Sequence, residues 1–376
     1  MAGKLKKDKE KGTYYFVLEA GKGANGKRRR IKRTGFKTKK EANAEMIKLE
    51  TELAINTTTP QESNMSLGEY LDYWLDNYAK TNTKPKTFVE YEKIIRNHLK
   101  PSMGHELLNT LKSIQIQAYY KRKLETLSAQ SVLHQHRLLS KALNDAVDWE
   151  FINKNVAKGA KPPKPIKTEM KTLNVDQLNL LFKSAKEKSP TYFPIIYGAG
   201  QTGMRKSELI GLTWQNVDLK SPNPKLYISQ TITEANGKYF FNPIPKGKKP
   251  RNIKITPQLA KLLSELKIEY DYQKKVFGDT YNPNNLVFCN SRGNIMAPSE
   301  ITRALKRVLK TAGLPDIRFH DLRHSHASIL LSANVHPKIV SDRLGHSKIG
   351  ITLDTYSHLT DSLEGLAVES LDQMLD

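Results

Sequence analysis

The sequence predicts a multidomain α+β protein. Its 376 residues exceed the length at which a single hydrophobic core usually stops growing, so we expect two or three domains. Apolar residues three and four positions apart, often after capping-box sequences, predict helices through most of the chain. Two Asn-Gly pairs, at 25–26 and 236–237, lie between strand-forming runs and predict hairpins. We therefore expect a small three-stranded sheet with one helix, a four-helix domain, and a mainly helical domain with a small antiparallel sheet.

The first predicted domain comprises residues 1–56 and is strongly basic. Its first 40 residues contain fifteen Lys or Arg and three acids. TYYFVLEA and KRRRIKRTGF predict strands, and Thr38 with Glu41 forms a capping box that predicts the start of a helix. A small basic sheet can enter the major groove of DNA. A solvated basic tail is the alternative, but the paired strands, the turn and the cap favour a folded domain.

The second predicted domain comprises residues 65–156, after a polar linker with the sequence NTTTPQESN. Its first two helices are predicted by capping boxes at Ser66–Glu69 and Thr87–Glu90, and Pro101 with Gly104 predicts the end of the second. Two more helices are expected near residues 113–125 and 129–148. Their aromatic and leucine residues are assigned to the core. Their lysines and arginines are either DNA-facing or solvated surface.

The remaining chain divides into a connector, a third domain and a tail. Residues 157–171 are rich in Pro and Lys and predict an extended basic connector. The third domain comprises residues 172–362. Residues 361–376 hold five acids and no Lys or Arg. We expect residues 363–376 to form an acidic amphipathic helix that docks on protein, because DNA would repel it. The helix could dock either on its own domain or on a neighbouring protomer.

The overall charge indicates a polyanionic partner. The formal net charge is +23 and the pI is near 9.7, which indicates nucleic acid. The single cysteine, Cys289, excludes an intramolecular disulfide framework and a Cys-rich zinc site; its apolar neighbours predict a buried strand position. The N-terminal sequence lacks a secretory signal, and no apolar run is long enough for a bilayer. We therefore expect a cytoplasmic protein, in the bacterial nucleoid or host cell cytoplasm, with no membrane partner.

Residues 319–358 contain the strongest functional signal. They include six of the ten histidines, together with Arg323 and a single tyrosine, Tyr356. A helix that begins near His320 would place His320, Arg323 and His324 on one face. Guanidinium, imidazole and phenol groups in one region suggest chemistry on an anion. Farther upstream, Arg205 follows a Gly-containing turn, and Glu208 is three residues later, where its carboxylate can hold the guanidinium.

Five short motifs occur in order along the chain. They are TGMRKSEL, PKGKKPR, HDLRHS, LGHS and DTYSH. Their order and intervals resemble those of the tyrosine recombinases, and the resemblance covers essentially the whole chain. The basic N-terminal sheet domain resembles that of integrases from temperate phages and conjugative transposons. This resemblance implies that the first domain binds arm-type DNA sites, the second binds the core site, and the third is catalytic.

The resemblance also implies roles for individual residues. The implied catalytic set is Arg205, Lys246, His320, Arg323, His346 and Tyr356. The two arginines would clamp the scissile phosphate, since paired charge-assisted hydrogen bonds suit its non-bridging oxygens. Tyr356 would be the nucleophile and His320 would accept its proton; His346 would support the phosphate by hydrogen bonding. Lys246 would protonate the leaving 5′ oxygen. Lys248 and Lys249 share its loop, and only alignment to a K-x-x-K-x-R pattern ending at Arg251 selects Lys246.

The expected function is site-specific recombination of DNA. The protein would integrate a mobile element, and we expect that it also excises the element. Both reactions would pass through a 3′-phosphotyrosyl intermediate that stores the energy of the broken linkage. Such a reaction needs neither ATP nor a metal, so we expect no cofactor. The expected partners are double-stranded DNA with core and arm sites, three further copies in a homotetramer, and an accessory DNA-bending or directionality protein. The resemblance suggests that the C-terminal tail docks on a neighbouring protomer.

Three other functions were weighed against this one. A DNA-relaxing topoisomerase would use the same tyrosine chemistry, but the additional N-terminal DNA-binding domain argues against it. A DNA-binding regulator with vestigial catalytic residues is disfavoured because all six expected positions hold competent residues. A metal-dependent nuclease could use His320, His324 and His326, but Arg323 between them would repel a cation.

Overall fold

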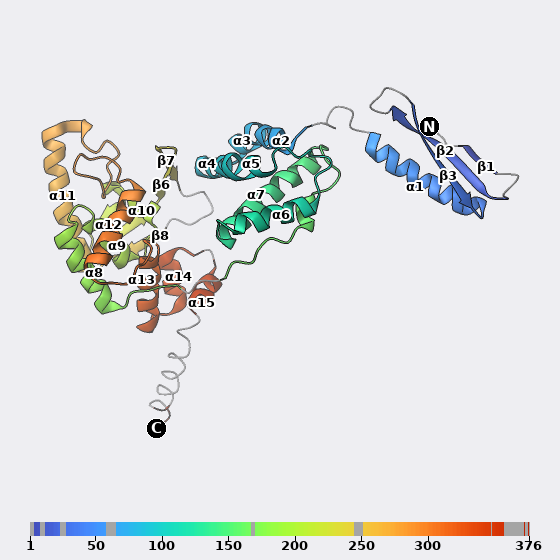
Figure 1. Ribbon diagram of the computed structural model, residues 1–376. Helices are drawn as coiled ribbons and strands as arrows, with labels where there is room; N and C mark the ends of the chain where they lie inside the picture. Colours follow the sequence, from blue (N-terminus) through green and yellow to red (C-terminus); the bar gives the residue numbers. More distant parts are fainter. Residues whose placement is uncertain are drawn as a thin grey trace. The chain divides into compact units, whose positions relative to one another are not determined.

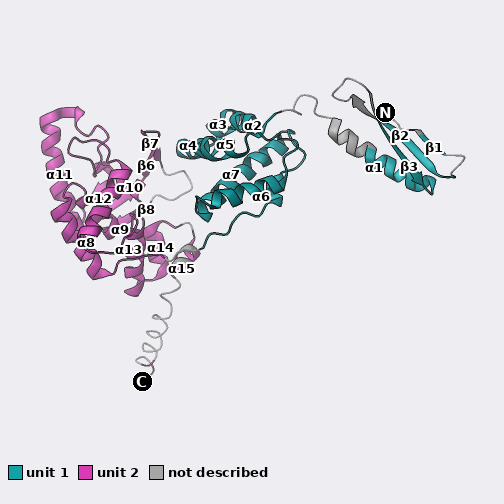
Figure 2. Cartoon of the chain, viewed as in Figure 1, with its two compact units in different colours: residues 1–166 teal, residues 167–376 magenta. Residues whose placement is uncertain are grey.

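The computed structural model forms two compact units, residues 1–166 and 167–376, which are described separately (Figure 1; Figure 2). The residues it describes are 4–7, 12–22, 28–57, 65–166, 170–243, 251–346, 348–356, 372 and 375. The predicted fold class is confirmed in each part. The exact domain boundaries given above remain predictions. No helix among the described residues combines the length and apolar character that crossing a membrane requires.

The first unit begins with an antiparallel sheet in the order β1-β2-β3, backed by one helix. Its elements are β1 (Lys4–Lys7), β2 (Tyr14–Lys22), β3 (Arg28–Phe36) and α1 (Lys39–Thr57). Phe16 and Leu18 of β2 pack with Met46 of α1 in a small core. The Thr38 hydroxyl accepts a hydrogen bond from the Glu41 amide at 3.2 Å, which confirms the predicted cap. The Asn25-Gly26 turn lies outside the described residues.

The rest of the first unit contains the four predicted helical segments. Its elements are α2 (Leu67–Trp74), α3 (Lys80–Asn82), α4 (Pro85–Ile94), α5 (Lys100–Met103), α6 (Ser113–Leu124), α7 (Ala129–Asp148) and a 3₁₀ turn (Val156–Gly159). A π-helical turn, Leu75–Ala79, joins α2 to α3, and another, Ile95–Leu99, joins α4 to α5. Trp74, Tyr119 and Leu139 are fully buried in its core.

The predicted start of the second helical segment is wrong, and its predicted end is correct only in part. Thr87 is not a cap, because α4 already begins at Pro85 after an extended Lys84; proline suits a first-turn position, where no backbone donor is needed. Pro101 does not end the segment, whereas Gly104 does, as the C-cap of α5. The preceding π-helical turn, in which the Lys100 amide donates to the Ile95 carbonyl, widens the backbone just before the proline ring and lets the helix continue to Met103.

The second unit is mainly helical, as predicted. Its helices are α8 (Val175–Lys188), α9 (Phe193–Thr202), α10 (Lys206–Ile210), α11 (Pro257–Phe277), α12 (Pro298–Thr311), α13 (Asp321–Ser332), α14 (Pro337–Leu344) and α15 (Ile349–Tyr356), with 3₁₀ turns at Trp214–Asn216 and Gly278–Thr280. Helix α9 packs against α8, α10, α11 and α13, while α14 contacts α13, α15 and β8. Leu181, Ile196 and Leu322 lie in the main core of this unit.

The single small sheet expected in this unit is two sheets. Strands β4 (Val217–Asp218), β5 (Lys225–Ile228) and β8 (Arg251–Lys254) form one antiparallel sheet. Strands β6 (Gln230–Ala235) and β7 (Lys238–Pro243) form a separate hairpin. The strands divide because β5 pairs with β8, far along the chain, while β6 pairs with β7. Asn236 (φ 48°) and Gly237 (φ 71°) form the turn of this hairpin, as predicted.

Two other predictions concern single segments. Cys289 forms an isolated antiparallel bridge with Ile295 and is half-buried, so it is less enclosed than expected. The predicted tail helix, residues 363–376, lies outside the described residues except at Asp372 and Leu375.

Candidate active site

The turn between α9 and α10 positions the first site arginine. Helix α9 ends at Gly203, whose φ of +65° is a left-handed conformation that favours glycine. A Cβ there would lie 2.7 Å from the Leu344 side chain and 2.8 Å from the His326 ring, so a larger residue would also displace these side chains. The chain then reverses, and Arg205 becomes the N-cap residue of α10. Close packing at Gly203 therefore fixes the position of the Arg205 backbone.

Arg205 is held by Glu208, as its spacing predicted. Its Nη1 donates to Glu208 Oε1 at 2.9 Å and its backbone amide donates to Glu208 Oε2 at 2.9 Å. Its Nη2 donates to the Gly345 carbonyl at 3.4 Å. The side chain is still 41% exposed, so a ligand can reach it. Arg205 is thus both fixed in direction and accessible.

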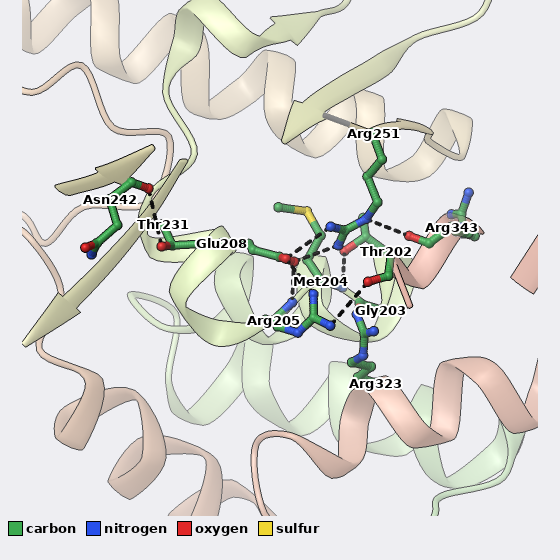
Figure 3. Close-up of polar contacts among 11 residues, drawn as sticks. Thr202, Gly203, Met204, Arg205, Glu208, Thr231, Asn242, Arg251, Arg323 and Arg343 are labelled. Atoms are coloured by element: carbon green, nitrogen blue, oxygen red, sulfur yellow. Dashed lines mark hydrogen bonds and ion pairs between the residues drawn. The ribbon is translucent and has the colours of Figure 1, made fainter. Parts of the chain in front are cut away.

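Arg323, on α13, approaches the same turn from another element. Its side chain is buried, and its Nη1 donates to the Gly203 carbonyl at 2.8 Å. Figure 3 shows this contact on one side of the turn and the Arg205–Glu208 pair on the other. Residues 203–205 therefore join two guanidinium groups that are more than one hundred residues apart in the sequence. Such a pair suits the oxygens of a phosphate.

The two predicted histidines share the electrostatic environment of these arginines. Burial lowers the pKa of His320 to about 4, and His324, Arg323 and Arg205 add to the effect. Burial lowers the pKa of His346 to about 4 as well, with further contributions from Arg323 and Arg205. The Nδ1 of His346 lies 2.8 Å from the Thr352 hydroxyl. Both imidazoles are consequently neutral at pH 7, so each can accept a proton or form a hydrogen bond.

Lys246 and Tyr356 are placed only through their neighbours in the chain. Lys246 lies outside the described residues, between Pro243 at the end of β7 and Arg251 at the start of β8. Tyr356 is the last residue of α15, which packs on α14, but its side chain is not described. The structure therefore brings together Arg205, His320, Arg323 and His346, while the side chains of the other two residues are left unplaced.

Two contacts near the site were not predicted from the sequence. Arg251 Nη1 and Nη2 donate to the two oxygens of Glu208 at 3.1 and 2.7 Å (Figure 3). His326 lies 2.9 Å from the Gly200 carbonyl through Nδ1, and its Nε2 accepts from Arg343 Nε at 3.0 Å. Both partners are distant in sequence, so no local spacing indicates them. His326 is a buried residue that joins α13 to the ends of α9 and α14.

Glu208 balances part of the positive charge. Its side chain is 4% exposed. Burial alone would raise its pKa, but the hydrogen bonds and charges of Arg251 and Arg205 outweigh burial, and the pKa is lower than usual. The carboxylate is therefore ionised, between two guanidinium groups. With Arg323 included, three cations and one anion leave the described part of the site positive, as the binding of an anion requires.

Family comparisons cover all three predicted parts of the chain. The phage integrase family matches residues 171–362. The N-terminal SAM-like domain of phage integrases matches residues 66–124, and an arm DNA-binding domain matches residues 4–53. These matches follow the same order as the predicted basic sheet, helical domain and catalytic domain.

Individual relatives agree with these matches. The tyrosine recombinase XerC-like protein of Caldanaerobacter subterraneus subsp. tengcongensis is 31% identical, over 100% of both chains. The integrase of Staphylococcus phage L54a is 25% identical over 85% of this chain and 96% of its own.

Solved structures share the fold. A fragment of the Tn1549 transposon integrase, in complex with a circular intermediate DNA, has a TM-score of 0.67 at 18% identity, over 81% of this chain and 100% of the fragment. Lambda integrase, as a tetramer bound to a Holliday junction, has a TM-score of 0.58 at 18% identity, over 93% of this chain and 94% of its own. The family matches and the full-length relative show that this chain belongs to the phage integrase family of tyrosine recombinases, which break and rejoin DNA.

Proposed function

We propose that this recombinase is the integrase of a mobile element, which it inserts into and excises from a DNA partner. The observation that supports the site assignment most strongly is the turn at residues 203–205. There, the Gly203 carbonyl accepts from Arg323 and Glu208 holds Arg205, and both guanidinium groups act electrostatically on the neutral imidazoles of His320 and His346. A phosphodiester placed against this group would have its non-bridging oxygens facing two cations and two hydrogen-bonding rings.

In the proposed cleavage step, the Tyr356 hydroxyl oxygen attacks the scissile phosphorus. The P–O bond to the 5′ oxygen breaks as the P–O bond to tyrosine forms, and His320 accepts the phenol proton. Its lowered pKa keeps the imidazole neutral and available at pH 7. The two arginines stabilise the charge that concentrates on the non-bridging oxygens, His346 adds a hydrogen bond, and Lys246 protonates the departing 5′ oxygen.

Rejoining is the reverse reaction with a different 5′ hydroxyl. The number of phosphoester bonds is unchanged in each step, so the 3′-phosphotyrosyl bond keeps the energy of the original linkage and no ATP is needed. The guanidinium pair neutralises the phosphate in the way that metal ions do in other phosphoryl-transfer sites. We therefore propose that cleavage proceeds when divalent metals are chelated.

The parts outside the catalytic domain would position the DNA and the other protomers. We propose that residues 1–56 bind arm sites and residues 65–156 bind the core site, with residues 157–171 as a basic connector. The tetramer of the related lambda integrase on a Holliday junction supports a homotetramer here. Residues 363–376 would join protomers, so their deletion should prevent assembly of the paired-DNA complex without unfolding the monomer. Unchanged assembly after this deletion would contradict that role.

Covalent trapping tests the proposed chemistry. The full chain is incubated in EDTA with a pool of nicked duplexes of random core sequence. Cleavage close to the nick releases a short oligonucleotide that carries the 5′ hydroxyl. This oligonucleotide diffuses away, so the strand cannot be rejoined and the covalent adduct accumulates. We expect a covalent adduct from the wild type and none from Tyr356→Phe. Tyr272→Phe is the matched control, because Tyr272 is 62% exposed on α11 of the same unit, and it should form the adduct normally. Cleavage that appears only when a divalent metal is added would contradict the proposal.

A further inference from the structure

Arg251 joins three separate segments of the catalytic unit. It is the first residue of β8, five residues after Lys246 in the sequence. Its Nη1 and Nη2 donate to Glu208 on α10, and its Nε donates to the Arg343 carbonyl at the end of α14 at 2.9 Å (Figure 3). Each of its three side-chain nitrogens thus has a protein acceptor. Arg251 is therefore bound to protein through its whole guanidinium group, and 13% of its side chain is exposed.

The same side chain packs against the turn that leads to His346. Gly345 has a φ of +69°, and a Cβ at this position would lie 2.7 Å from Arg251 Nη1 and 3.0 Å from its Cδ. Arg205 Nη2 also donates to the Gly345 carbonyl. The two arginines and Glu208 therefore form one connected group with this turn. A shift of Arg251 would be transmitted to Arg205 and to the backbone beside His346.

Glu208 accepts hydrogen bonds from both arginines at once. Its Oε1 accepts from the Nη1 atoms of Arg205 and Arg251, and its Oε2 accepts from the Arg205 amide and Arg251 Nη2. Without Arg251, the carboxylate would balance the charge of Arg205, and the pair would be neutral. With Arg251 present, the three side chains carry a net charge of +1. Because the carboxylate is buried, solvent screens its charge only weakly, and the second cation matters to any nearby anion.

We propose that Arg251 is a positioning residue for strand cleavage. It neutralises Glu208, so that this carboxylate can hold Arg205 in a fixed direction without cancelling the charge that Arg205 presents to the scissile phosphate. Arg251 acts through Glu208 and the 343–345 turn and does not itself touch the DNA. This inference depends on the proposed role of Arg205, and it adds a requirement that the six-residue catalytic set does not contain.

A double-mutant cycle tests the charge argument. The rate of adduct formation is measured in single turnovers for the wild type, Arg251→Gln, Glu208→Gln and the double variant. Arg251→Gln brings the charge of the three side chains to zero and should slow the reaction about 100-fold. The double variant restores a charge of +1 and should be about 10-fold faster than Arg251→Gln. A purely structural tie predicts the opposite, because removal of both partners leaves Arg205 with the fewest contacts.

Arg251→Lys provides a second comparison. Lysine keeps the charge but cannot make three hydrogen bonds in a plane, so we expect a rate about 10-fold below the wild type, faster than that of Arg251→Gln. Thermal unfolding shows which variants fold. If Arg251→Gln does not fold, Arg251→Lys and the double variant carry the test, since both retain a charge of +1 and should remain within about 10-fold of the wild type.

The outcomes separate this inference from the proposed function. A wild-type chain that forms no adduct with any nicked duplex would overturn the proposed function itself. A wild-type chain that forms the adduct, with a double variant no faster than Arg251→Gln, would overturn only the role of Arg251. If Arg251→Gln does not fold, rates for Arg251→Lys and the double variant far below the 10-fold range would have the same meaning.

Discussion

The cationic side chains of the catalytic unit and those of the N-terminal sheet are held in different ways. In the catalytic unit, Arg323 is 3% exposed and donates to a backbone carbonyl, while Arg205 and Arg251 bind one buried carboxylate. On β3, Lys32 and Arg33 are exposed, and the Lys32 ammonium lies over the Tyr15 ring, 5.1 Å from its centroid. The same kinds of residue thus occur as fixed and as solvated groups.

Fixed and solvated cations contribute differently to activity. Fixed guanidinium groups meet a charge at one defined position, and their hydrogen bonds to protein already oppose reorganisation during a reaction. Solvated lysines and arginines attract a polyanion over a broad surface, and the release of counterions makes that attraction depend on salt. Substitutions in the first region should therefore change the rate of the chemical step, and substitutions in the second should change DNA affinity.

Arg323→Lys should have the largest effect. Lysine keeps the positive charge but lacks the planar guanidinium, so one of the two proposed sets of paired hydrogen bonds to the phosphate should be lost. We expect the single-turnover cleavage rate to fall about 100- to 1000-fold, with DNA affinity within about threefold of the wild type. Arg292→Lys, at an exposed position of the same unit, is the control and should cleave normally. If weaker DNA binding fully accounts for the slower cleavage, Arg323 contributes to DNA affinity, as the solvated cations do, and not to the chemical step.

Gly345→Ala tests how tightly the Arg251 side chain packs against the turn before His346. The new methyl group would meet the Arg251 side chain at 2.7 Å, and we expect cleavage to fall about 30-fold because Arg205 and the His346 turn shift together. Gly313→Ala is a matched control: its φ is also positive, at +65°, but no atom lies within 4 Å of the added Cβ. Both variants should lose about 1 kcal/mol of unfolding free energy from backbone strain. Equal cleavage rates for the two variants would contradict tight packing.

Acidification should lower the unfolding free energy of the catalytic unit. Burial lowers the pKa of His326 to about 4, with further contributions from Arg343 and Arg323 that exceed the opposing hydrogen bond to Gly200. The unfolded chain binds this proton near pH 6.5, so the unfolding free energy is retained above that pH and falls as the pH decreases toward 4. At pH 5, we expect His326 to account for a loss of about 2 kcal/mol relative to pH 7.

Equilibrium urea unfolding at several pH values measures this contribution. His326→Gln should reduce the slope of unfolding free energy against pH between 7 and 5. The same slope in His326→Gln and the wild type would show that this imidazole is protonated in the folded protein as readily as in the unfolded one.

The smallest effect is expected for the exposed cations of β3. Lys32→Gln combined with Arg33→Gln should lower affinity for duplex DNA about threefold to tenfold at moderate salt, and should reduce the slope of log affinity against log salt by up to about 2. The cleavage rate of bound complexes should not change. Filter binding across a salt series measures the slope. An unchanged slope, or a slower chemical step, would remove the distinction between the two regions.

Sequence patterns predicted the features that depend on neighbouring residues. The caps at Thr38 and Ser66, the Asn236-Gly237 turn and the Arg205–Glu208 pair all act within three or four positions and are confirmed. The cap at Thr87 was wrong because Pro85, two residues earlier, starts the helix first. A local motif that fits two starting points does not decide between them.

The features that depend on tertiary contacts were missed. Arg251 and Glu208 are 43 residues apart, and they meet only because β8 pairs with β5 and α14 packs beside it. The division of the expected single sheet into two has the same origin, since strand pairing over long loops is not written in local patterns. The resemblance to tyrosine recombinases pointed to Arg323, while the carbonyl that holds it, that of Gly203, required the structure.

Mapping of the covalent adduct tests whether the site built around Arg205 and Arg323 directs the chemistry to Tyr356. The trapped complex is digested with protease and nuclease, and the nucleotide-bearing peptide is sequenced by mass spectrometry. We expect a 3′-linked nucleotide on Tyr356, in equal yield with and without EDTA. A nucleotide on any other residue, or one linked through its 5′ phosphate, would contradict it.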